Sequence, residues 1–305
     1  MKIKNTANAF FSIILICFIT LLSSCKGSGS VPASELSSAI MSGYAVVQFL
    51  DVGQADCSLI SLPDGRHILI DAGNEEDGDL IVDYLKNSGI SKIDYIIGTH
   101  PHEDHIGGLD EVINSFTVGK IILPRIDESD ITGTIVYEEV LLAAKESRRE
   151  VLRGFAGLEL IKDETVTLTC VAPNKDNYSS LNDYSVVLLF SYGETEILFT
   201  GDAEAKSEKE ILAADFDISA DILKVGHHGS KTATSDDFLK KVNPEYAVIS
   251  VGEDNIYTLP DEEVIDKLSD ISVLRTDEKG SIFFVLNTQE IVNQYCSETV
   301  CLDGN

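Results

Sequence analysis

The densest group of metal-binding side chains lies in one short segment, His100-Pro101-His102-Glu103-Asp104-His105. Imidazole nitrogens and carboxylate oxygens are the usual ligands of zinc and related divalent ions. His100 and His102 stand two residues apart and can turn toward one ion, while Asp104 and His105 can turn toward a second. A solvated polar loop is the alternative. Only 6 of the 305 residues are histidine, and three of them fall here, so the segment indicates a metal site.

A pair of histidines occurs again in Gly226-His227-His228-Gly229-Ser230. Taken alone, this pair could equally well be structural. Next to the first motif it is better interpreted as part of the same site, because the two motifs hold five of the six histidines. The remaining histidine, His67, lies beside a Pro-Asp-Gly turn and is expected to be an ordinary surface or strand residue.

Two aspartates follow strand-like runs and extend the set. Asp202 ends Thr200-Gly201-Asp202 and could bridge two ions, while Asp71 opens Asp71-Ala72-Gly73 and could orient the metal loop through a hydrogen bond. Each signal is weak alone, because Asp and Gly are common in turns.

The scaffold for these residues is predicted from short apolar runs that alternate with helical patterns. Helices are expected at 79–87, 135–149 and 203–213. Strands are expected at 46–50, 57–62, 67–70, 93–98, 121–123, 166–171, 186–191, 196–200, 221–225, 246–251, 273–275, 282–286 and 291–295. This order predicts an α/β layered domain with mixed sheets. The candidate polar residues follow strand ends, where functional loops are usually placed.

The order of the motifs resembles the metallo-β-lactamase superfamily. The match covers nearly all of the chain after its N-terminal segment, in residues 71–73, 99–108, 182–185, 200–202 and 224–230. Within that superfamily, residues 49–56, the His227-His228-Gly229-Ser230 motif and Asn182-x-x-Ser185 are similar to the extracellular domain of ComEC competence proteins and to its stand-alone relatives.

The resemblance implies an αββα sandwich over residues 44–305, with the site at one edge between two sheets. It also implies two divalent ions, zinc or manganese. His100 and His102 would hold the first ion, and Asp104, His105 and the histidine pair the second, with Asp202 as the bridge between them. Which histidine of the pair binds is open, and His228 is favoured.

Position alone suggests further roles around such a site. Asp104 would help to orient or deprotonate the attacking water, and His227 would face the substrate and stabilise charge or protonate the leaving group. Asn182 and Ser185 would donate hydrogen bonds to the substrate.

The sequence departs from the family pattern in two places. Many members carry a third histidine on the first ion, but no histidine occurs from residue 106 to 226. The first ion is therefore expected to have fewer strong ligands. Relatives also often have a histidine immediately before a proline, where this chain has Leu259 and Pro260.

These features predict a phosphoesterase or phosphodiesterase that acts on a small or medium phosphoester outside the cytoplasm. An extracellular nuclease is the nearest alternative. The net charge of −28 disfavours it, because binding a long polyanion depends on basic side chains. A lactamase fits less well without the third histidine, and a non-catalytic surface protein that binds metal or a partner is the alternative outside enzymes. No obligate protein partner is evident.

The N-terminus predicts export. Lys2 and Lys4 precede an apolar run at 10–22, and Leu22-Ser23-Ser24-Cys25 follows it. This order resembles a bacterial lipoprotein signal over residues 1–24, which implies lipidation of Cys25 and anchoring at a membrane of the cell envelope. An uncleaved anchor is the alternative. Residues 25–43, rich in Gly, Ser and Pro from 27 to 38, are predicted to form a flexible tether.

The remaining cysteines give further expectations. Cys57 and Cys170 lie in apolar runs and are expected to be buried. Cys296 and Cys301 could pair in an oxidising compartment. No Cys-x-x-Cys spacing occurs, so a thiolate zinc site is not expected.

Overall fold

The computed structural model describes residues 33–126 and 134–297. The predicted signal sequence, the lipidated Cys25 and the partner Cys301 of the suggested disulfide fall outside this part of the chain. Those three expectations therefore remain predictions.

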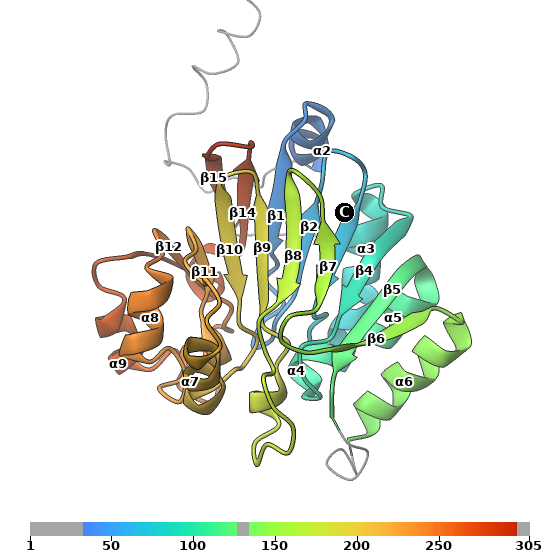
Figure 1. The fold of residues 1–305 in the computed structure, drawn as a ribbon. Coiled ribbons are helices and arrows are strands. Elements are labelled where there is room, and N and C mark those ends of the chain that lie inside the picture. The colour runs from blue at the N-terminus through green and yellow to red at the C-terminus, as the bar shows by residue number, and fades with distance from the viewer. Residues whose placement is uncertain (1–32, 127–133, 298–305) are drawn as a thin grey trace, which may run out of the picture.

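The first sheet has eight strands in the order β15-β14-β1-β2-β3-β4-β5-β6 (Figure 1). Its strands are β1 (Ala45–Phe49), β2 (Ser58–Ser61), β3 (His67–Ile70), β4 (Lys92–Ile97), β5 (Thr117–Pro124), β6 (Glu150–Gly154), β14 (Ser281–Leu286) and β15 (Ile291–Ser297). Strands β3 to β6 pair in parallel, so their carboxyl ends meet at one edge of the sheet.

The second sheet has seven strands in the order β13-β12-β11-β10-β9-β8-β7. Its strands are β7 (Glu159–Lys162), β8 (Val166–Cys170), β9 (Leu188–Tyr192), β10 (Thr195–Phe199), β11 (Ile222–Lys224), β12 (Tyr246–Ile249) and β13 (Ser272–Arg275). Strands β10 to β13 are parallel, whereas β7 to β10 pair as an antiparallel meander.

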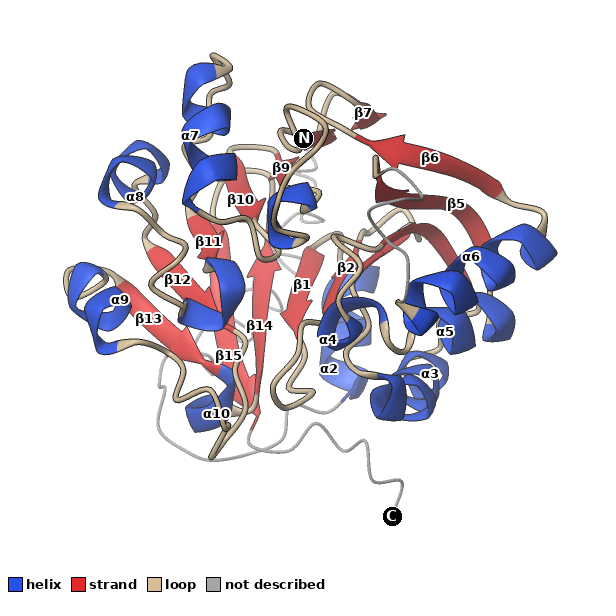
Figure 2. Cartoon of the chain, turned by 90° about the horizontal axis from the view of Figure 1, so that it is seen from below, coloured by secondary structure: helices blue, strands red, loops and turns tan. Residues whose placement is uncertain are grey.

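Helices cover the outer faces of both sheets (Figures 1 and 2). The first sheet carries α3 (Gly78–Asn87), α5 (Leu109–Ser115) and α6 (Ile135–Ser147), and the second carries α7 (Ala205–Ala213), α8 (Asp236–Val242) and α9 (Glu262–Lys267). The short helices α4 (Glu103–Ile106) and α10 (Thr276–Lys279) lie in loops. The expected αββα sandwich is confirmed.

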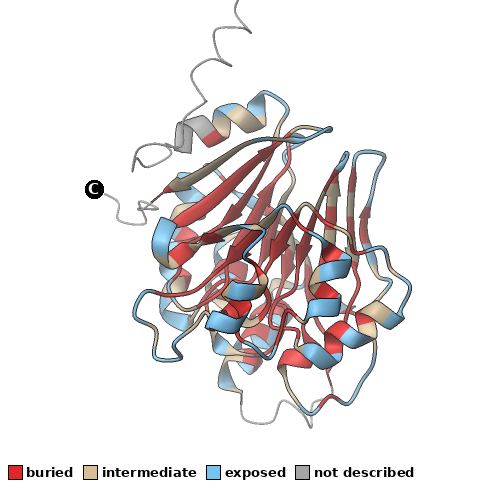
Figure 3. Ribbon diagram, turned by 90° about the vertical axis from the view of Figure 1, so that its left-hand side faces the viewer, coloured by how far each residue is buried: buried red, intermediate tan, exposed pale blue. Residues whose placement is uncertain are grey.

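One apolar core lies between the two sheets, where the buried strands of Figure 3 face one another, and two others lie between each sheet and its helices. Alternate residues of β8 and β9 are buried, as the two-residue period of a strand requires. The Phe49 ring stacks on Phe199 from the other sheet and meets Phe284 edge-on. Cys57 and Cys170 are buried, as expected.

The flexible tether predicted over 25–43 is wrong where it overlaps an additional helix, α2 (Ala33–Met41). Leu36 and Ile40 lie one helical turn apart and pack on the β1–β14 face beside Val46 and Phe283. This apolar pair gives the segment a face to bury, which its Ser-rich composition conceals. Helix α2 lies at the opposite end of the sandwich from α4 (Figure 1).

The sequence patterns also missed elements and misplaced some boundaries. The helix predicted to reach Arg149 ends at Ser147, because Arg148 adopts a left-handed conformation, and β6 begins at Glu150. Strands β6 and β7 went unrecognised. They are the outermost strands of their sheets and show exposed residues that weaken a strand pattern. The short helices α4, α5, α8, α9 and α10 were also unpredicted.

Candidate metal centre

Four loops that follow parallel strands bring the candidate residues together at one edge between the sheets, seen end-on in Figure 2. Asp71 follows β3, His100 follows β4, Asp202 follows β10 and His228 follows β11. Gly107 permits the close packing of the first motif, because a Cβ there would lie 2.2 Å from backbone atoms of Asn74 and Glu75.

Asp71 lies behind the first motif and accepts three hydrogen bonds. Its Oδ1 accepts the Thr99 N–H at 2.8 Å, and its Oδ2 accepts the Thr99 hydroxyl and the His105 Nδ1–H, both at 2.8 Å. Because a carboxylate only accepts, these bonds keep a proton on His105 Nδ1, so Nε2 is the nitrogen that faces the site. The structure thus places Asp71 where the predicted orienting role requires it.

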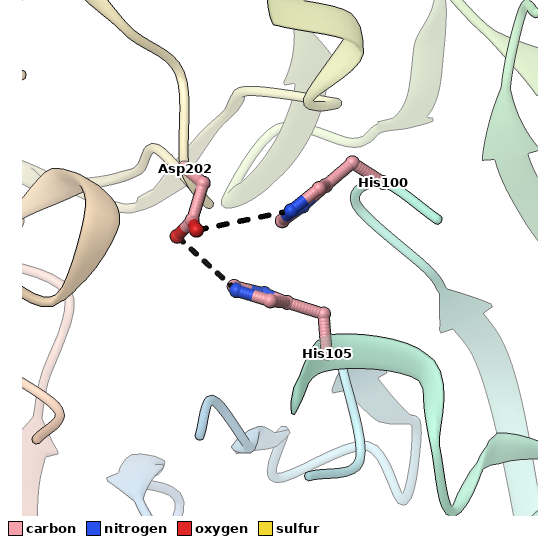
Figure 4. Close-up of side chains that lie close together, drawn as sticks. All are labelled: His100, His105 and Asp202. Atoms are coloured by element: carbon pink, nitrogen blue, oxygen red, sulfur yellow. Dashed lines mark ion pairs between the residues drawn. The ribbon is translucent and has the colours of Figure 1, made fainter. Parts of the chain in front are cut away.

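Asp202 lies at the middle of the cluster and is almost fully buried. Its Oδ1 is 3.1 Å from His105 Nε2, and its Oδ2 is 3.8 Å from His100 Nε2 (Figure 4). Its Oδ1 also lies 3.8 Å from His228 Nε2. One carboxylate therefore touches residues from both histidine motifs.

His228 faces inward and His227 faces the opening. The side chain of His228 is 2% exposed, its Nδ1 donates to the Ser250 carbonyl at 2.9 Å, and its Nε2 lies 3.2 Å from Asp104 Oδ2. The His227 side chain is 26% exposed. Both residues have left-handed backbones, with φ of 50° and 52°, which turn the two rings in different directions.

His100 is fully buried, whereas His102 is only partly buried at the start of α4. His102 Nδ1 lies 3.0 Å from His100 Nε2. His100 Nδ1 lies 3.2 Å from the Thr99 hydroxyl, which donates to Asp71 and can accept from the histidine. This series of hydrogen bonds directs His100 Nε2 toward Asp202 and His102.

The two predicted substrate contacts occupy different places. Asn182 starts a 3-10 turn (Asn182–Tyr184), and its Nδ2 lies 3.4 Å from the His227 ring and 3.5 Å from Glu204 Oε1. Ser185 is fully buried, and its hydroxyl accepts the backbone N–H of Asp202 at 3.1 Å. Ser185 therefore supports the Asp202 loop from beneath.

The pKa shifts at this site reflect burial together with the close approach of carboxylates and imidazoles. Burial alone would lower the pKa of His105, but Asp202 and Asp71 raise it well above its usual range. Burial opposes ionisation of Asp202, yet His105 and His228 hold its pKa well below the ordinary value. In His100, burial and the nearby His105 lower the pKa, which favours the neutral form that binds a metal ion.

The donor set fits a divalent ion. Within the described part of the chain, His105 Nε2, His228 Nε2 and Asp202 Oδ1 are buried and make no hydrogen bond, although each lies within ion-pair distance of an oppositely charged group. Buried polar atoms are rarely left in this state, and three that face one another suit a shared cation. Among the residues that the structure describes, three groups have all their ligand atoms within 4.8 Å of one another: His100–His105–Asp202, Asp104–His105–His228 and Asp56–Asp71–His105.

These groups can be compared with the ligand sets that the sequence resemblance implies. The second group contains the residues expected around the second ion. For the first ion, the structure groups His100 with His105 and Asp202, while His102 lies outside these groups and contacts His100.

Two buried residues in this centre were not identified as site residues from the sequence. Lys224 at the end of β11 forms a 2.9 Å ion pair with Asp56, and both side chains are nearly inaccessible to solvent. A lysine inside an otherwise apolar strand is a signal that could have found the pair, because buried lysine requires a charged partner.

A family model of the metallo-beta-lactamase superfamily matches residues 50–253. The chain therefore belongs to this superfamily, and it has the fold of a metallo-hydrolase. The groups of His and Asp residues described above are its candidate divalent-metal ligands.

Within the superfamily, the similar curated proteins include competence proteins, as the sequence resemblance predicted. The "ComE operon protein 3" of Bacillus subtilis is 31% identical over 264 residues, which are 79% of this chain and 33% of that protein. The "Competence protein ComA" of Neisseria gonorrhoeae is 29% identical over 287 residues, 90% of this chain and 38% of that protein. The chain thus spans about a third of the length of these relatives.

Solved structures agree on the fold. The metallo-beta-lactamase fold protein YhfI of Bacillus subtilis matches with a TM-score of 0.53 and 13% identity, covering 80% of this chain and 100% of that one. CmlA, a diiron beta-hydroxylase of Streptomyces venezuelae, matches with a TM-score of 0.52 and 13% identity, covering 80% of this chain and 54% of that one.

Between residues 33 and 297, apart from the gap at 127–133, no helix has the length and apolar character needed to span a bilayer.

Proposed function

We propose that this protein is a metal-dependent phosphoesterase or phosphodiesterase. The observation that carries the proposal is the buried cluster in which ligand atoms of His105, His228 and Asp202 face one another without hydrogen bonds, beside a partly exposed His227. Divalent cations held by this cluster would suit an anionic substrate group, even on an acidic protein. The likeness to competence proteins supports phosphate chemistry.

Two ions, zinc or manganese, would be held by this donor set. His100 and His102 would hold the first, Asp104, His105 and His228 the second, and Asp202 would contribute to both. When bound, such ions lower the pKa of water at the site and offset negative charge on phosphoryl oxygens during a displacement.

The protein's own residues then have distinct tasks. Asp104 is 31% exposed, and its Oδ2 lies 3.2 Å from His228 Nε2, so its other oxygen would be available to orient or deprotonate a water. His227 lies 3.7 Å from Asp202 and faces the opening, where it can stabilise or protonate a phosphate oxygen. Asn182 lies against His227, with its Nδ2 3.4 Å from that ring, and would donate a hydrogen bond to the substrate. Ser185 would act mainly by supporting the Asp202 loop.

A nuclease is the second candidate, because the relatives of this chain include competence proteins. The net charge of −28 favours a small or medium phosphoester over a long polyanion. A nuclease would show steep loss of binding with salt, since phosphate contacts release counterions.

The site of action would be the cell envelope, with the protein exported and anchored by a lipid on Cys25. Radiolabelled palmitate should label the wild-type protein and not Cys25→Ser. Labelling that persists in the variant would refute the anchor.

Hydrolysis of bis-p-nitrophenyl phosphate by the purified protein tests the proposal. We expect turnover that requires added zinc or manganese and stops on chelation. His102→Ala should reduce the rate at least about a hundredfold. His67→Ala changes the one histidine outside the two motifs and is the matched control. An unchanged rate in His102→Ala would refute the assigned site, and no turnover of any phosphoester would favour a binding protein.

A further inference from the structure

A lysine and an aspartate are buried together behind the candidate metal ligands. In the part of the chain that the structure describes, Lys224 is the one lysine or arginine in the buried class. Its Nζ lies 2.9 Å from Asp56 Oδ2 and donates to the Val225 carbonyl at 3.1 Å. Burial of such a pair is costly, so its retention inside a binding site suggests a task there.

Asp56 connects the segments that carry the ligands. Its backbone N–H donates to the Asp104 carbonyl at 2.9 Å, and its carbonyl accepts the Gly73 N–H at 2.9 Å. Its side chain lies 3.5 Å from His228 Nδ1 and 3.9 Å from His105 Nδ1. The side of each imidazole ring opposite its ligand nitrogen therefore meets the same carboxylate.

The positive charge of Lys224 offsets the negative charge of Asp56. Asp56, Asp71 and His105 form a group with the spacing of a metal site, so a carboxylate at Asp56 could draw a cation to the wrong side of His105. The Lys224 ammonium already lies against Asp56. One oxygen of that carboxylate is thereby occupied by a cation that belongs to the protein.

We infer that Lys224 is the permanent cation of this centre: it neutralises Asp56, holds that carboxylate behind His105 and His228, and leaves the divalent ions to the Asp202 side. This inference rests on the metal centre of the proposed function and is independent of the substrate. Asp56 and Lys224 act through the ligands and are positioning residues.

Electrostatics predicts opposite effects from the two halves of the pair. Asp56→Asn leaves an unpaired ammonium near the site, which repels divalent ions. Lys224→Met leaves an unpaired carboxylate, which attracts them. For a unit and a double charge within about 10 Å in a partly buried site, each effect should reach at least about tenfold in affinity. The double variant removes both charges and should bind ions within about threefold of wild type.

The experiment measures the affinity of the full chain for Zn²⁺ alone, by competition with a chromophoric chelator. The variants are Asp56→Asn, Lys224→Met and the double substitution, and thermal unfolding verifies that each is folded. Glu159 and Lys162 form an exposed ion pair at 2.6 Å on β7, far from the ligands in sequence, so Glu159→Gln and Lys162→Met are matched controls that should leave the affinity unchanged.

Weaker binding in Asp56→Asn, tighter binding in Lys224→Met and recovery in the double variant support the inference. Weaker binding in both single variants, with no recovery in the double, would overturn it, because a purely structural pair moves both in the same direction. If a single variant does not fold, the double variant decides. Zn²⁺ affinity within about threefold of wild type supports the inference, and a larger loss overturns it. Absence of Zn²⁺ binding by the wild-type protein would instead refute the metal centre of the proposed function.

Discussion

Replacing Asp71 with asparagine should disable the metal centre while preserving its shape. Asp71 has a left-handed backbone with φ of 59°, which asparagine also tolerates, and the two side chains are nearly equal in size. The Thr99 N–H needs an acceptor, so the amide oxygen of the substituted side chain should take the place of Oδ1. The amide nitrogen then faces His105 Nδ1, where it can only donate.

The consequence is a change of tautomer in His105. Its Nδ1 must accept from the amide, so its proton moves to Nε2, the atom that lies 3.1 Å from Asp202 and would bind an ion. A protonated Nε2 is no longer a ligand. The lost charged hydrogen bond is worth about 1.5–3 kcal/mol. Changes to residues that orient a metal ligand typically reduce metal affinity about 10- to 100-fold, which corresponds to about 1.4–2.7 kcal/mol.

Chelator competition with Zn²⁺ measures this effect, and nitrogen NMR of labelled histidine reports the tautomer of His105. Asp94→Asn is the matched control. It makes the same atomic change in the same sheet, at a carboxylate that accepts hydrogen bonds from the His67 N–H and the Lys92 ammonium. Equal affinity in Asp71→Asn and wild type, with Nδ1 still protonated, would refute the reasoning.

Three further predictions concern the scaffold. Gly229→Ala should lower the free energy of unfolding by at least about 2 kcal/mol and weaken metal binding, since φ is +82° and a Cβ would lie 2.5 Å from a proline side chain. Gly157→Ala has φ of +89° with nothing within 4 Å, so it should show the backbone strain alone; equal losses in the two variants would argue against the close contact. Leu36→Ala should cost about 2 kcal/mol in urea unfolding because α2 is packed on the sheet, whereas Met41→Ala, at an 89% exposed residue, should cost almost nothing. Burial lowers the pKa of His67 in the folded protein. Its contribution to stability is therefore fully present above the unfolded-state pKa of about 6.5 and declines as the pH falls toward the folded-state pKa. The stability advantage of wild type over His67→Gln should shrink between pH 7 and pH 5, and a constant difference would contradict this.

The sequence predicted the scaffold well where burial imposes a pattern. Apolar runs followed by polar loops located β3, β4, β10 and β11. Parallel strands that are buried on both faces consist almost entirely of apolar residues, so they are easy to recognise in a sequence. The edge strands β6 and β7 and helix α2 were missed, since half-exposed or short elements carry weaker patterns. In α2 only the spacing of Leu36 and Ile40 marks the buried face, and its Ser-rich surroundings hide it.

The candidate site was only partly predictable. Scarce histidines placed the two motifs in one site, but their roles depend on backbone geometry that spacing does not contain. The left-handed backbones of His227 and His228 bury His228 beside Asp104 and expose His227. The sequence of this pair does not indicate that backbone conformation. Ser185 looks like a substrate contact in the sequence, yet it lies beneath Asp202. The Asp56–Lys224 pair is long-range in sequence and becomes visible only when the two sheets meet.

The number of divalent ions bound by the folded chain tests the central claim most directly. Native mass spectrometry of protein loaded with zinc or manganese should show two ions per chain in wild type. One ion should remain when His100 and His102 are both replaced by alanine, because Asp104, His105 and His228 still form a complete group. Asp202→Ala should weaken both positions. Wild-type protein that binds no divalent ion, or a variant lacking both His100 and His102 that still binds two, would contradict the account.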